Sequence, residues 1–405
     1  MKVSYETNQR SKIKDQKSKI PDSRSLKSWI EIAYHIEYFA SYYRKTSLKN
    51  MSRLEKIKEQ FKDLKIDSFL VKNLANIRYI SGFSGSAASV LLTKDDDYFI
   101  SDFRYKTQSS KEVKENFEII IYVQNSLLFL KDLIEKHDLK RIGFESNFLT
   151  YNDVLGLREQ FKGTEFVPVD SLIEKIVIVK NDKEIADTRK AVEITDRTFS
   201  ELLKFIKPGL TEREVSAQIS YMQKHFGADG DSFDAIVASG ERSAFPHARP
   251  TDRKISNGDL LTLDFGCTVN GMKSDMTRTL AIGDISEESM NIYSIVKEAQ
   301  LKALHEVKAG MNTKVIDAVA RNYIKENGYG DNFGHGLGHG VGYDIHEKPA
   351  LNERTEYILE VNNIITIEPG IYVEGVGGVR IEDDVIVTKE GCEILNKSSK
   401  ELITL

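Results

Sequence analysis

The chain has 405 residues, of which 40% are hydrophobic and 29% are charged, and its formal net charge is -5. This composition predicts an ordinary globular protein of two to three domains, and the absence of a basic excess argues against nucleic acid as a partner. No apolar run is long enough to span a bilayer and the N-terminus carries no apolar signal-peptide core, so we expect no membrane partner.

The cysteine content favours a reducing, cytoplasmic compartment. Cys267 and Cys392 are the only two cysteines, and neither has a spacing typical of a zinc site or a redox motif. We interpret Cys267 as a buried structural thiol, because it lies in an apolar run without an oriented His–Asp pair.

Residues 1–50 differ in composition from the rest of the chain. They are polar and basic at first, then rich in aromatic residues between Tyr34 and Tyr43. We interpret them as an atypical N-terminal extension, either disordered or appended to the protein, and a native N-terminal arm is the open alternative. At Ser52–Glu55 a capping box predicts the first helix, so we place the start of a domain at residue 51.

Helical and strand patterns alternate between residues 51 and 170. Short β-rich runs punctuated by turn residues predict four strands, at Ser68–Val71, Ser89–Thr93, Tyr98–Ser101 and Ile119–Val123. The Asp95–Asp97 run predicts a turn between the second and third. This pattern predicts an α/β domain over 51–170, without a group of residues that carries chemistry, followed by a linker over 171–183.

The remaining segment, 184–405, interleaves helices with antiparallel strands and predicts an α+β domain. One helix is predicted from Asp182 to Pro208, a second after a capping box at Thr211, and a third from Ser286 to Gly310. The predicted strands are Ala235–Ala238, Leu260–Phe265, Asn363–Ile367 and Val379–Val387.

Two aspartates end up close together if the predicted strands pair. Asp264 closes an apolar strand, and Asp275 follows eleven residues later with Gly271 between them. This spacing predicts a turn and a return as a neighbouring strand. Two carboxylates on adjacent strands repel each other unless a cation or a shared proton lies between them.

Glycine and histidine dominate the segment 334–346. His335, His339 and His346 fall within twelve residues and are separated largely by glycine. Glycine permits close backbone approach and positive φ, and it disfavours helix, so the segment is predicted to be a shaped loop or an extended strand.

Two further acids interrupt apolar strands near the C-terminus. Glu368 ends a strand before Pro369–Gly370, and Arg380 and Glu382 are two residues apart, so they share a face of a strand. Each acid alone is typical of a turn or cap residue, and a lone histidine is usually structural. Together, oxygen donors with one imidazole suit Mn, Co or Zn, although spacing alone does not establish a metal.

These segments, taken in order, resemble the metallopeptidases of the aminopeptidase P, prolidase and methionine aminopeptidase group. The resemblance covers about 180–405 and implies the "pita-bread" fold, while 52–170 resembles the creatinase-type N-terminal domain of aminopeptidase P and prolidase. The segment 1–50 is the one departure from the family layout.

The resemblance implies a dinuclear metal centre. It makes Asp264 a ligand of one metal, makes His339 and Glu368 ligands of the other, and makes Asp275 and Glu382 bridges between the two. Manganese is the expected ion, with cobalt or zinc as alternatives.

The resemblance also assigns the surrounding residues. His247 and His335 match substrate-side histidines, His346 matches a histidine that stabilises the tetrahedral intermediate, and Arg380 matches an arginine that contacts the substrate or the metals. Glu368 would also carry a proton to the leaving nitrogen. The expected catalytic residues are therefore His247, His346, Glu368 and Arg380, and the expected substrate-binding residues are His247, His335 and Arg380.

The implied activity is hydrolysis of X–Pro bonds in peptides or dipeptides by a homodimer. We expect an aminopeptidase that releases the residue before proline, with an X–Pro dipeptidase as the alternative. A creatine-type amidinohydrolase and a non-catalytic pita-bread module that binds a peptide or protein are remote alternatives, because both lack the complete ligand set present here.

Overall fold

The structure is a computed structural model that describes residues 51–123 and 126–405. The predictions made for residues 1–50 therefore lie outside the described residues. Residues Gln60–Leu405 form one compact unit. Within the described ranges, no helix combines the length and the apolar character needed to cross a bilayer.

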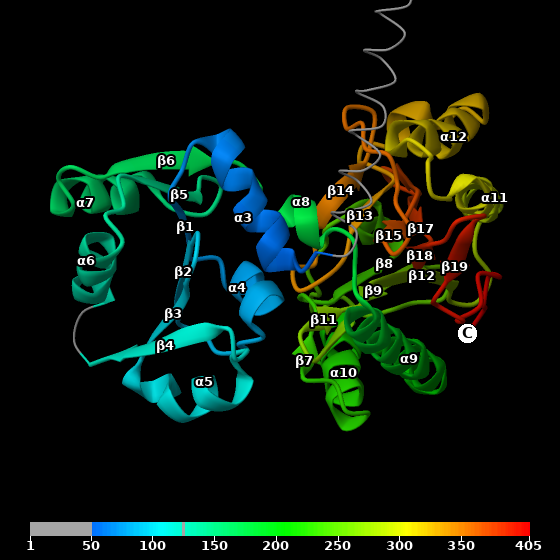
Figure 1. The fold of residues 1–405 in the computed structure, drawn as a ribbon. Coiled ribbons are helices and arrows are strands. Elements are labelled where there is room, and N and C mark those ends of the chain that lie inside the picture. Colours follow the sequence, from blue (N-terminus) through cyan, green and yellow to red (C-terminus); the bar gives the residue numbers. More distant parts are fainter. Residues whose placement is uncertain (1–50, 124–125) are drawn as a thin grey trace, which may run out of the picture. The chain divides into compact units, whose positions relative to one another are not determined.

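A six-stranded mixed sheet forms the centre of the N-terminal α/β domain, in the order β4-β3-β2-β1-β5-β6 (Figure 1). Its strands are β1 (Ser68–Val71), β2 (Ser89–Thr93), β3 (Asp97–Asp102), β4 (Phe117–Tyr122), β5 (Arg141–Glu145) and β6 (Glu165–Val169). Its helices are α3 (Arg53–Leu64), α4 (Leu74–Ser81), η2 (Phe103–Tyr105), α5 (Lys106–Glu112), α6 (Ser126–Lys136), α7 (Tyr151–Gln160) and α8 (Glu174–Val177). Apolar residues of β1–β3, α6 and α7 share one buried core.

The predicted strands of this domain are confirmed with small changes at their ends. Two of them coincide with β1 and β2, and the other two lie within one or two residues of β3 and β4. The predicted Asp95–Asp97 turn is one residue too long, since Asp97 already pairs with Leu92. The capping box at the start of α3 forms as predicted, with the Ser52 N–H donating to Glu55 and the Glu55 N–H donating to Ser52.

The C-terminal domain is an α+β structure in which short sheets are flanked by helix pairs (Figure 1). Its strands are β7 (Gly230–Asp231), β8 (Ile236–Ser239), β9 (Leu260–Phe265), β10 (Cys267–Val269), β11 (Met272–Lys273), β12 (Met276–Ala281), β13 (Gly338–Gly340), β14 (Glu347–Leu351), β15 (Ile364–Ile367), β16 (Gly370–Val373), β17 (Gly377–Arg380), β18 (Asp383–Val387) and β19 (Cys392–Ile394). Its helices are α9 (Asp182–Phe205), α10 (Glu212–His225), η3 (Gly240–Ala244), α11 (Glu287–Glu306), α12 (Thr313–Glu326) and η4 (Gly330–Asn332).

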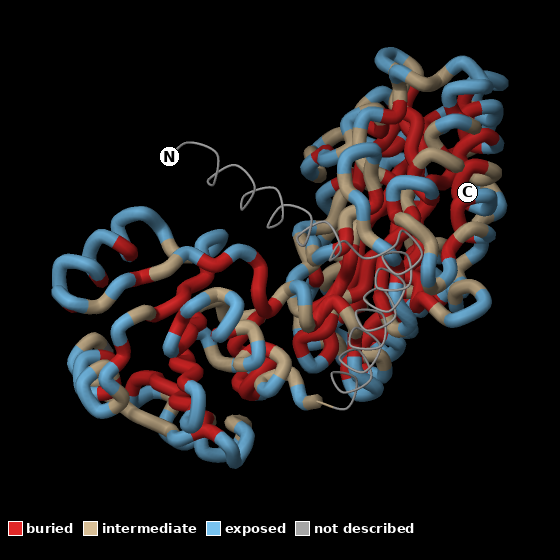
Figure 2. The backbone as a smooth tube through the Cα atoms, turned by 45° about the horizontal axis from the view of Figure 1, so that its top comes forward, coloured by how far each residue is buried: buried red, intermediate tan, exposed pale blue. Residues whose placement is uncertain are grey.

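The helix pairs cover different strands. Helices α9 and α10 pack on β7, β8, β10 and β11, whereas α11 and α12 pack on β14–β17. Two of the buried clusters fill the spaces between these layers. In Figure 2 the buried stretches lie toward the interior of each domain and the exposed stretches along its outer surface. The fold class expected from the sequence is therefore confirmed for both domains. The boundaries proposed for the linker remain a prediction, and α8 lies within it.

The hairpin predicted between the two aspartates is present. Strands β9 and β12 are antiparallel, with Asp264 opposite Thr277. Between them, Asn270 and Gly271 both have positive φ, as a tight two-residue hairpin turn requires.

The predicted ends of two helices and the extent of one strand are wrong. The helix expected to run from Asp182 to Pro208 ends at Phe205, because Ile206 already has an extended backbone. The helix expected to run from Ser286 to Gly310 ends at Glu306, because buried Val307 takes an extended backbone to join the core. The strand expected over Val379–Val387 is broken at Ile381–Glu382. The reason is that β17 pairs with β16 whereas β18 pairs with β15, so the chain changes sheet at Glu382.

A buried ion pair joins the two strands that flank this break. Arg278 on β12 donates to the carboxylate of Asp383 on β18, and their side chains are 1% and 0% exposed. The same guanidinium donates to the carbonyl oxygens of Thr277 and Glu382, at 2.9 and 2.5 Å. Arg278 therefore fixes β12 against the segment that carries Glu382.

Replacing Arg278 with methionine (Arg278→Met) should lower the free energy of unfolding by about 3 kcal/mol, because Asp383 and several carbonyl oxygens lose a buried donor. Denaturation in urea measures the change. Arg189→Met is the matched control: it breaks a pair with Glu393 whose side chains are 45% and 44% exposed, and should cost less than about 1 kcal/mol. Equal losses in the two variants would contradict a structural role for the buried pair.

Candidate metal centre

All nine site residues predicted from the sequence line one cavity of about 490 Å³. They are the five candidate ligands and the four surrounding residues: Asp264, Asp275, His339, Glu368 and Glu382, with His247, His335, His346 and Arg380. The residues come from a span of more than one hundred positions, so only the folded chain brings them together.

Strand ends place the four carboxylates. Asp264 lies near the end of β9, and Asp275 immediately precedes β12. Glu368 follows β15, and Glu382 lies where the chain passes from β17 to β18. A strand end allows a polar side chain to reach a cavity while its apolar neighbours stay in the core, and all four carboxylates use this position.

Close backbone packing explains the glycines around His339. A Cβ atom at Gly338 would overlap the carbonyl oxygen of Thr366 on β15, and one at Gly340 would overlap that of Lys348 on β14. Of the segment 334–346, only Gly338–Gly340 forms a strand and the rest is loop, so both predicted forms occur. The sequence also allowed these glycines to have positive φ. Neither Gly338 nor Gly340 has it.

His339 presents one ring nitrogen to the carboxylates. Its Nδ1 donates to the carbonyl oxygen of Gly340 at 3.0 Å, which leaves Nε2 without a proton in the neutral ring. Nε2 lies 3.4 Å from Glu368 Oε1 and 3.7 Å from Asp275 Oδ2. Burial lowers the pKa of His339 to about 4, so the imidazole is neutral and offers a lone pair.

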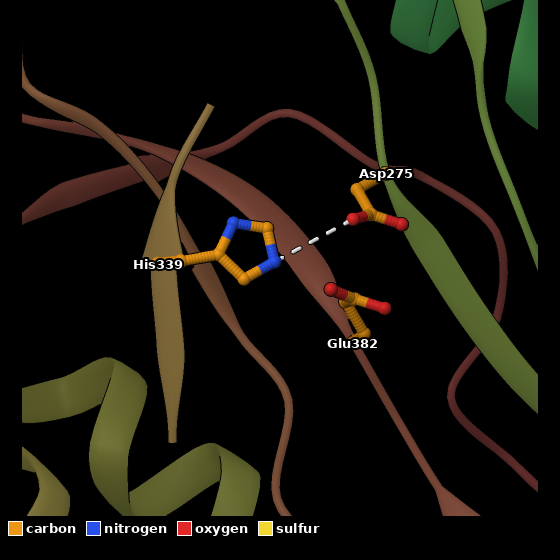
Figure 3. Close-up of side chains that lie close together, drawn as sticks. All are labelled: Asp275, His339 and Glu382. Atoms are coloured by element: carbon orange, nitrogen blue, oxygen red, sulfur yellow. Dashed lines mark ion pairs between the residues drawn. The ribbon is translucent and has the colours of Figure 1, made fainter. Parts of the chain in front are cut away.

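Asp275, His339 and Glu382 converge on one point (Figure 3). One potential ligand atom from each lies within 4.8 Å of the others. This separation is compatible with a single metal ion between the three side chains, because metal–ligand distances are about 2 Å.

The carboxylates carry more negative charge than their surroundings neutralise. Burial raises the pKa of Asp275 and of Glu382 well above the usual range, and repulsion from the neighbouring carboxylates adds to it. Burial likewise raises the pKa of Glu368 to about 8. Arg380 donates to Asp264 Oδ2, but the Oδ1 atoms of Asp264 and Asp275 are buried without a hydrogen-bond partner in the described structure.

These observations fit a divalent cation. Unpartnered buried carboxylate oxygens and raised carboxyl pKa values both mean that a positive charge in the cavity would be strongly favoured. The donor set of carboxylate oxygens with one neutral imidazole suits a borderline-to-hard divalent ion.

Three supporting residues were not found from the sequence. Tyr372 Oη accepts from Arg380 Nη1 at 2.8 Å and lies 2.9 Å from His335 Nε2. Thr277 donates to Glu382 Oε2 at 2.6 Å and accepts from Arg380 Nε at 3.0 Å.

Thr366 supports the remaining ligands in the same way, since its hydroxyl accepts from the His339 N–H at 3.1 Å and donates to Glu368 at 3.3 Å. One sequence signal was available. Thr277 and Thr366 are each two residues from a ligand acid, and therefore face the same side of an extended chain.

Comparison with known proteins identifies the family. The profile of metallopeptidase family M24 matches residues 186–389, and the profile of the creatinase/prolidase N-terminal domain matches residues 53–177. The chain belongs to metallopeptidase family M24.

Several relatives of this M24 peptidase match along nearly their whole length. The solved structure of an Xaa-Pro dipeptidase from Bacillus anthracis is 42% identical with a TM-score of 0.85, and the match covers 87% of this chain and 99% of that one. An X-Pro aminopeptidase structure from Thermotoga maritima is 37% identical with a TM-score of 0.80, covering 88% and 100%. An Xaa-Pro dipeptidase from Pyrococcus furiosus is 36% identical over 87% of this chain and 99% of the relative.

Membership of the family confirms the enzyme class and the pita-bread fold expected from the sequence, and it implies divalent metal ions. The roles of the individual site residues stay predictions.

Asp275→Asn should abolish peptidase activity and reduce bound metal, because it removes an anionic ligand from the middle of the cluster. Elemental analysis of the purified variant measures the metal, and a peptidase assay measures activity. Asp284→Asn, at an exposed position outside the cavity, is the control and should keep both. Full activity in Asp275→Asn would exclude this residue as a ligand.

His346→Ala should reduce turnover about a hundredfold by removing a hydrogen-bonding group beside the reacting atoms. Metal content should remain at the wild-type value, because the His346 ring faces the His339 ring edge-on at a centroid distance of 4.5 Å and is not part of the ligand cluster. His305→Ala, whose side chain is 86% exposed, is the matched control. Loss of metal from His346→Ala would show that the residue is a ligand.

Proposed function

We propose that this M24 peptidase hydrolyses Xaa-Pro dipeptides with two divalent metal ions, most suitably manganese. The observation that carries the proposal is the convergence on one cavity of three buried carboxylates and the half-buried Glu368, a neutral imidazole, three further histidines and an arginine. A hydrolase of this kind needs an activated water, a stabilised oxyanion and a proton donor for the leaving nitrogen, and these residues could serve all three needs.

The charge balance supports two ions. Four carboxylates carry four negative charges when ionised, which two divalent cations would neutralise. Asp264, Asp275, His339, Glu368 and Glu382 would hold them, and the ions would lower the pKa of a bound water and polarise the scissile carbonyl. An oxygen-rich donor set favours manganese over ions that prefer thiolate.

The chain's own side chains would then handle orientation and protons. His339 keeps Nε2 directed at the cavity through its Nδ1–Gly340 hydrogen bond. Glu368 lies beside this nitrogen and could hold a proton and pass it to the leaving nitrogen. His346 would donate a hydrogen bond to the oxyanion, and Arg380, oriented by Thr277 and Tyr372, would bind the substrate.

The apolar part of the cavity suits a proline ring. Phe233, Ile236, Pro246 and Ile345 line the same cavity as the ligands. The nitrogen of an X–Pro bond carries no N–H, so its recognition relies on the fit of the rigid ring and not on a hydrogen bond from that nitrogen.

Two arguments favour the dipeptide over longer peptides. Two of the three similar proteins described above are named Xaa-Pro dipeptidases, and one of these is the more similar solved structure. In addition, Arg249, which is exposed, lines the cavity and could pair with the free carboxylate that a dipeptide has next to the proline ring. The aminopeptidase preference formed from the sequence is thus less well supported than its dipeptidase alternative. The homodimer expected from the resemblance stays a prediction.

The decisive comparison is between Xaa-Pro and Xaa-Pro-Xaa substrates on the manganese-loaded enzyme. We expect kcat/KM for the dipeptide to be at least about tenfold higher than for the tripeptide. This factor corresponds to the free energy of one charge-assisted hydrogen bond to the terminal carboxylate. Preferred cleavage of the tripeptide would instead establish an aminopeptidase.

Arg249→Leu separates recognition from chemistry. It should raise KM for the dipeptide about tenfold with little change in kcat, because it removes only the contact to the carboxylate. Arg213→Leu is the matched control, since Arg213 is exposed, pairs with Asp252 and does not line the cavity. An unchanged dipeptide KM in Arg249→Leu would exclude Arg249 as the carboxylate contact.

A further inference from the structure

A second cavity lies inside the N-terminal domain. It has a volume of about 350 Å³ and shares no lining residue with the candidate metal centre. One wall is formed by strands β1–β3 and the others by α6, α7 and the segment that precedes α7. Its apolar lining includes Leu70, Ile100, Leu130, Phe148 and Leu157.

One lysine lines this apolar space. The Lys72 ammonium donates to Ser89 Oγ at 2.8 Å, and Ser89 also lines the cavity. Within the described ranges, no carboxylate oxygen lies within ion-pair distance of the Lys72 Nζ atom. Burial lowers the pKa of Lys72, and the negative charges of Asp153 and Glu145 offset this effect only in part.

The two acids near Lys72 accept hydrogen bonds from groups other than its ammonium. Glu145 accepts hydrogen bonds from the backbone N–H groups of Lys72 and Asn73 and from the Asn76 side chain. Asp153 also lines the cavity, and its carboxylate accepts from the N–H and hydroxyl of Thr150 as part of a capping box. Both acids favour the charged form of Lys72 from a distance, but neither forms an ion pair with it.

Helix α7 leaves the cavity open on its side. Asn152, Gly156 and Gln160 are spaced four residues apart, so they lie on one helix face, and all three line the cavity and are exposed. A Cβ atom at Gly156 would meet no atom within 4 Å. Glycine in a helix interior lowers helix stability by about 1 kcal/mol relative to alanine. At position 156 it also leaves empty the space that a side chain would occupy.

We propose that this cavity binds a small organic carboxylate with an apolar body. The carboxylate pairs with the Lys72 ammonium and accepts from the Ser89 hydroxyl, while the apolar body packs against the leucine and phenylalanine side chains and reaches toward Gly156. The ligand supplies the counter-charge that Lys72 lacks and removes apolar surface of both partners from water.

The same features disfavour other ligand classes. A phosphate group carries more charge and more acceptor oxygens than one lysine and one hydroxyl satisfy, so its burial here would leave oxygens unpartnered. An uncharged apolar molecule would gain the packing but would leave Lys72 uncompensated. The pairing of one cation with an apolar cavity therefore selects a monoanion with a hydrophobic tail.

Titration calorimetry with octanoate, a carboxylate with an alkyl tail, tests the proposal on the full-length, metal-loaded enzyme. Lys72→Met should weaken octanoate binding about tenfold or more, the range for a charge-assisted hydrogen bond. Octanol, which has the same tail without the charge, should bind wild-type protein about tenfold more weakly than octanoate does.

A second variant tests the cavity without removing the lysine. Gly156→Leu places a side chain in the open space, and should abolish octanoate binding while the thermal unfolding temperature stays the same or rises, because leucine is a better helix former. Lys175→Met, at an exposed lysine on α8, is the charge control and should bind octanoate as wild type does. Peptidase activity should be unchanged in these variants, so the outcome does not depend on the proposed substrate.

Two results would overturn the proposal. Octanoate binding that is equally strong in Lys72→Met and Gly156→Leu would place the ligand elsewhere, for example at the metal centre. Failure of the folded wild-type protein to bind octanoate at millimolar concentration would show that the cavity does not accept this class of ligand.

Discussion

Mutual repulsion between four carboxylates, three of them buried and one half-buried, is the constraint around which the catalytic domain is arranged. Asp264, Asp275, Glu368 and Glu382 share one cavity, and burial together with repulsion raises the pKa of three of them. Such a cluster is costly unless cations enter it, and it persists because the surrounding fold fixes its members in place. Bound divalent cations would relieve this repulsion, so the same charges that lower stability without metal would favour metal binding.

The surrounding fold supplies that rigidity through paired strands and polar contacts behind the cavity. Arg278 connects β12 to the carbonyl oxygen of Glu382 and to Asp383, whose carboxylate also accepts from Gln300 and Lys400. Thr277 and Thr366 hold the ligand side chains themselves. The glycines beside His339 allow β13 to lie close to β14 and β15, so that an imidazole reaches the same point as acids from two other strands.

Chemistry and specificity use different parts of the cavity. The candidate ligand cluster would supply the hydrolytic chemistry. The surrounding apolar residues and Arg249 would determine where along the peptide the bond lies. This separation explains why the ligand motifs did not distinguish a dipeptidase from an aminopeptidase. The N-terminal domain adds a cavity of different character, mostly apolar, in which Lys72 donates to Ser89 and forms no ion pair with any residue that the structure describes.

The sequence by itself determined many of the local elements and predicted the candidate site residues. Capping boxes located the starts of α3 and α10, and strand-end acids with the Gly/His segment marked the candidate ligands, because these signals depend on neighbours along the chain. It also indicated the Asn270–Gly271 hairpin region through Gly271.

Only the tertiary structure decided that all nine residues face one cavity, that the chain changes sheet at Glu382, and that Tyr372 joins His335 to Arg380. The same holds for the cavity shared by Lys72, Ser89 and Gly156. Each of these facts depends on contacts between residues far apart in the sequence, which no local pattern records.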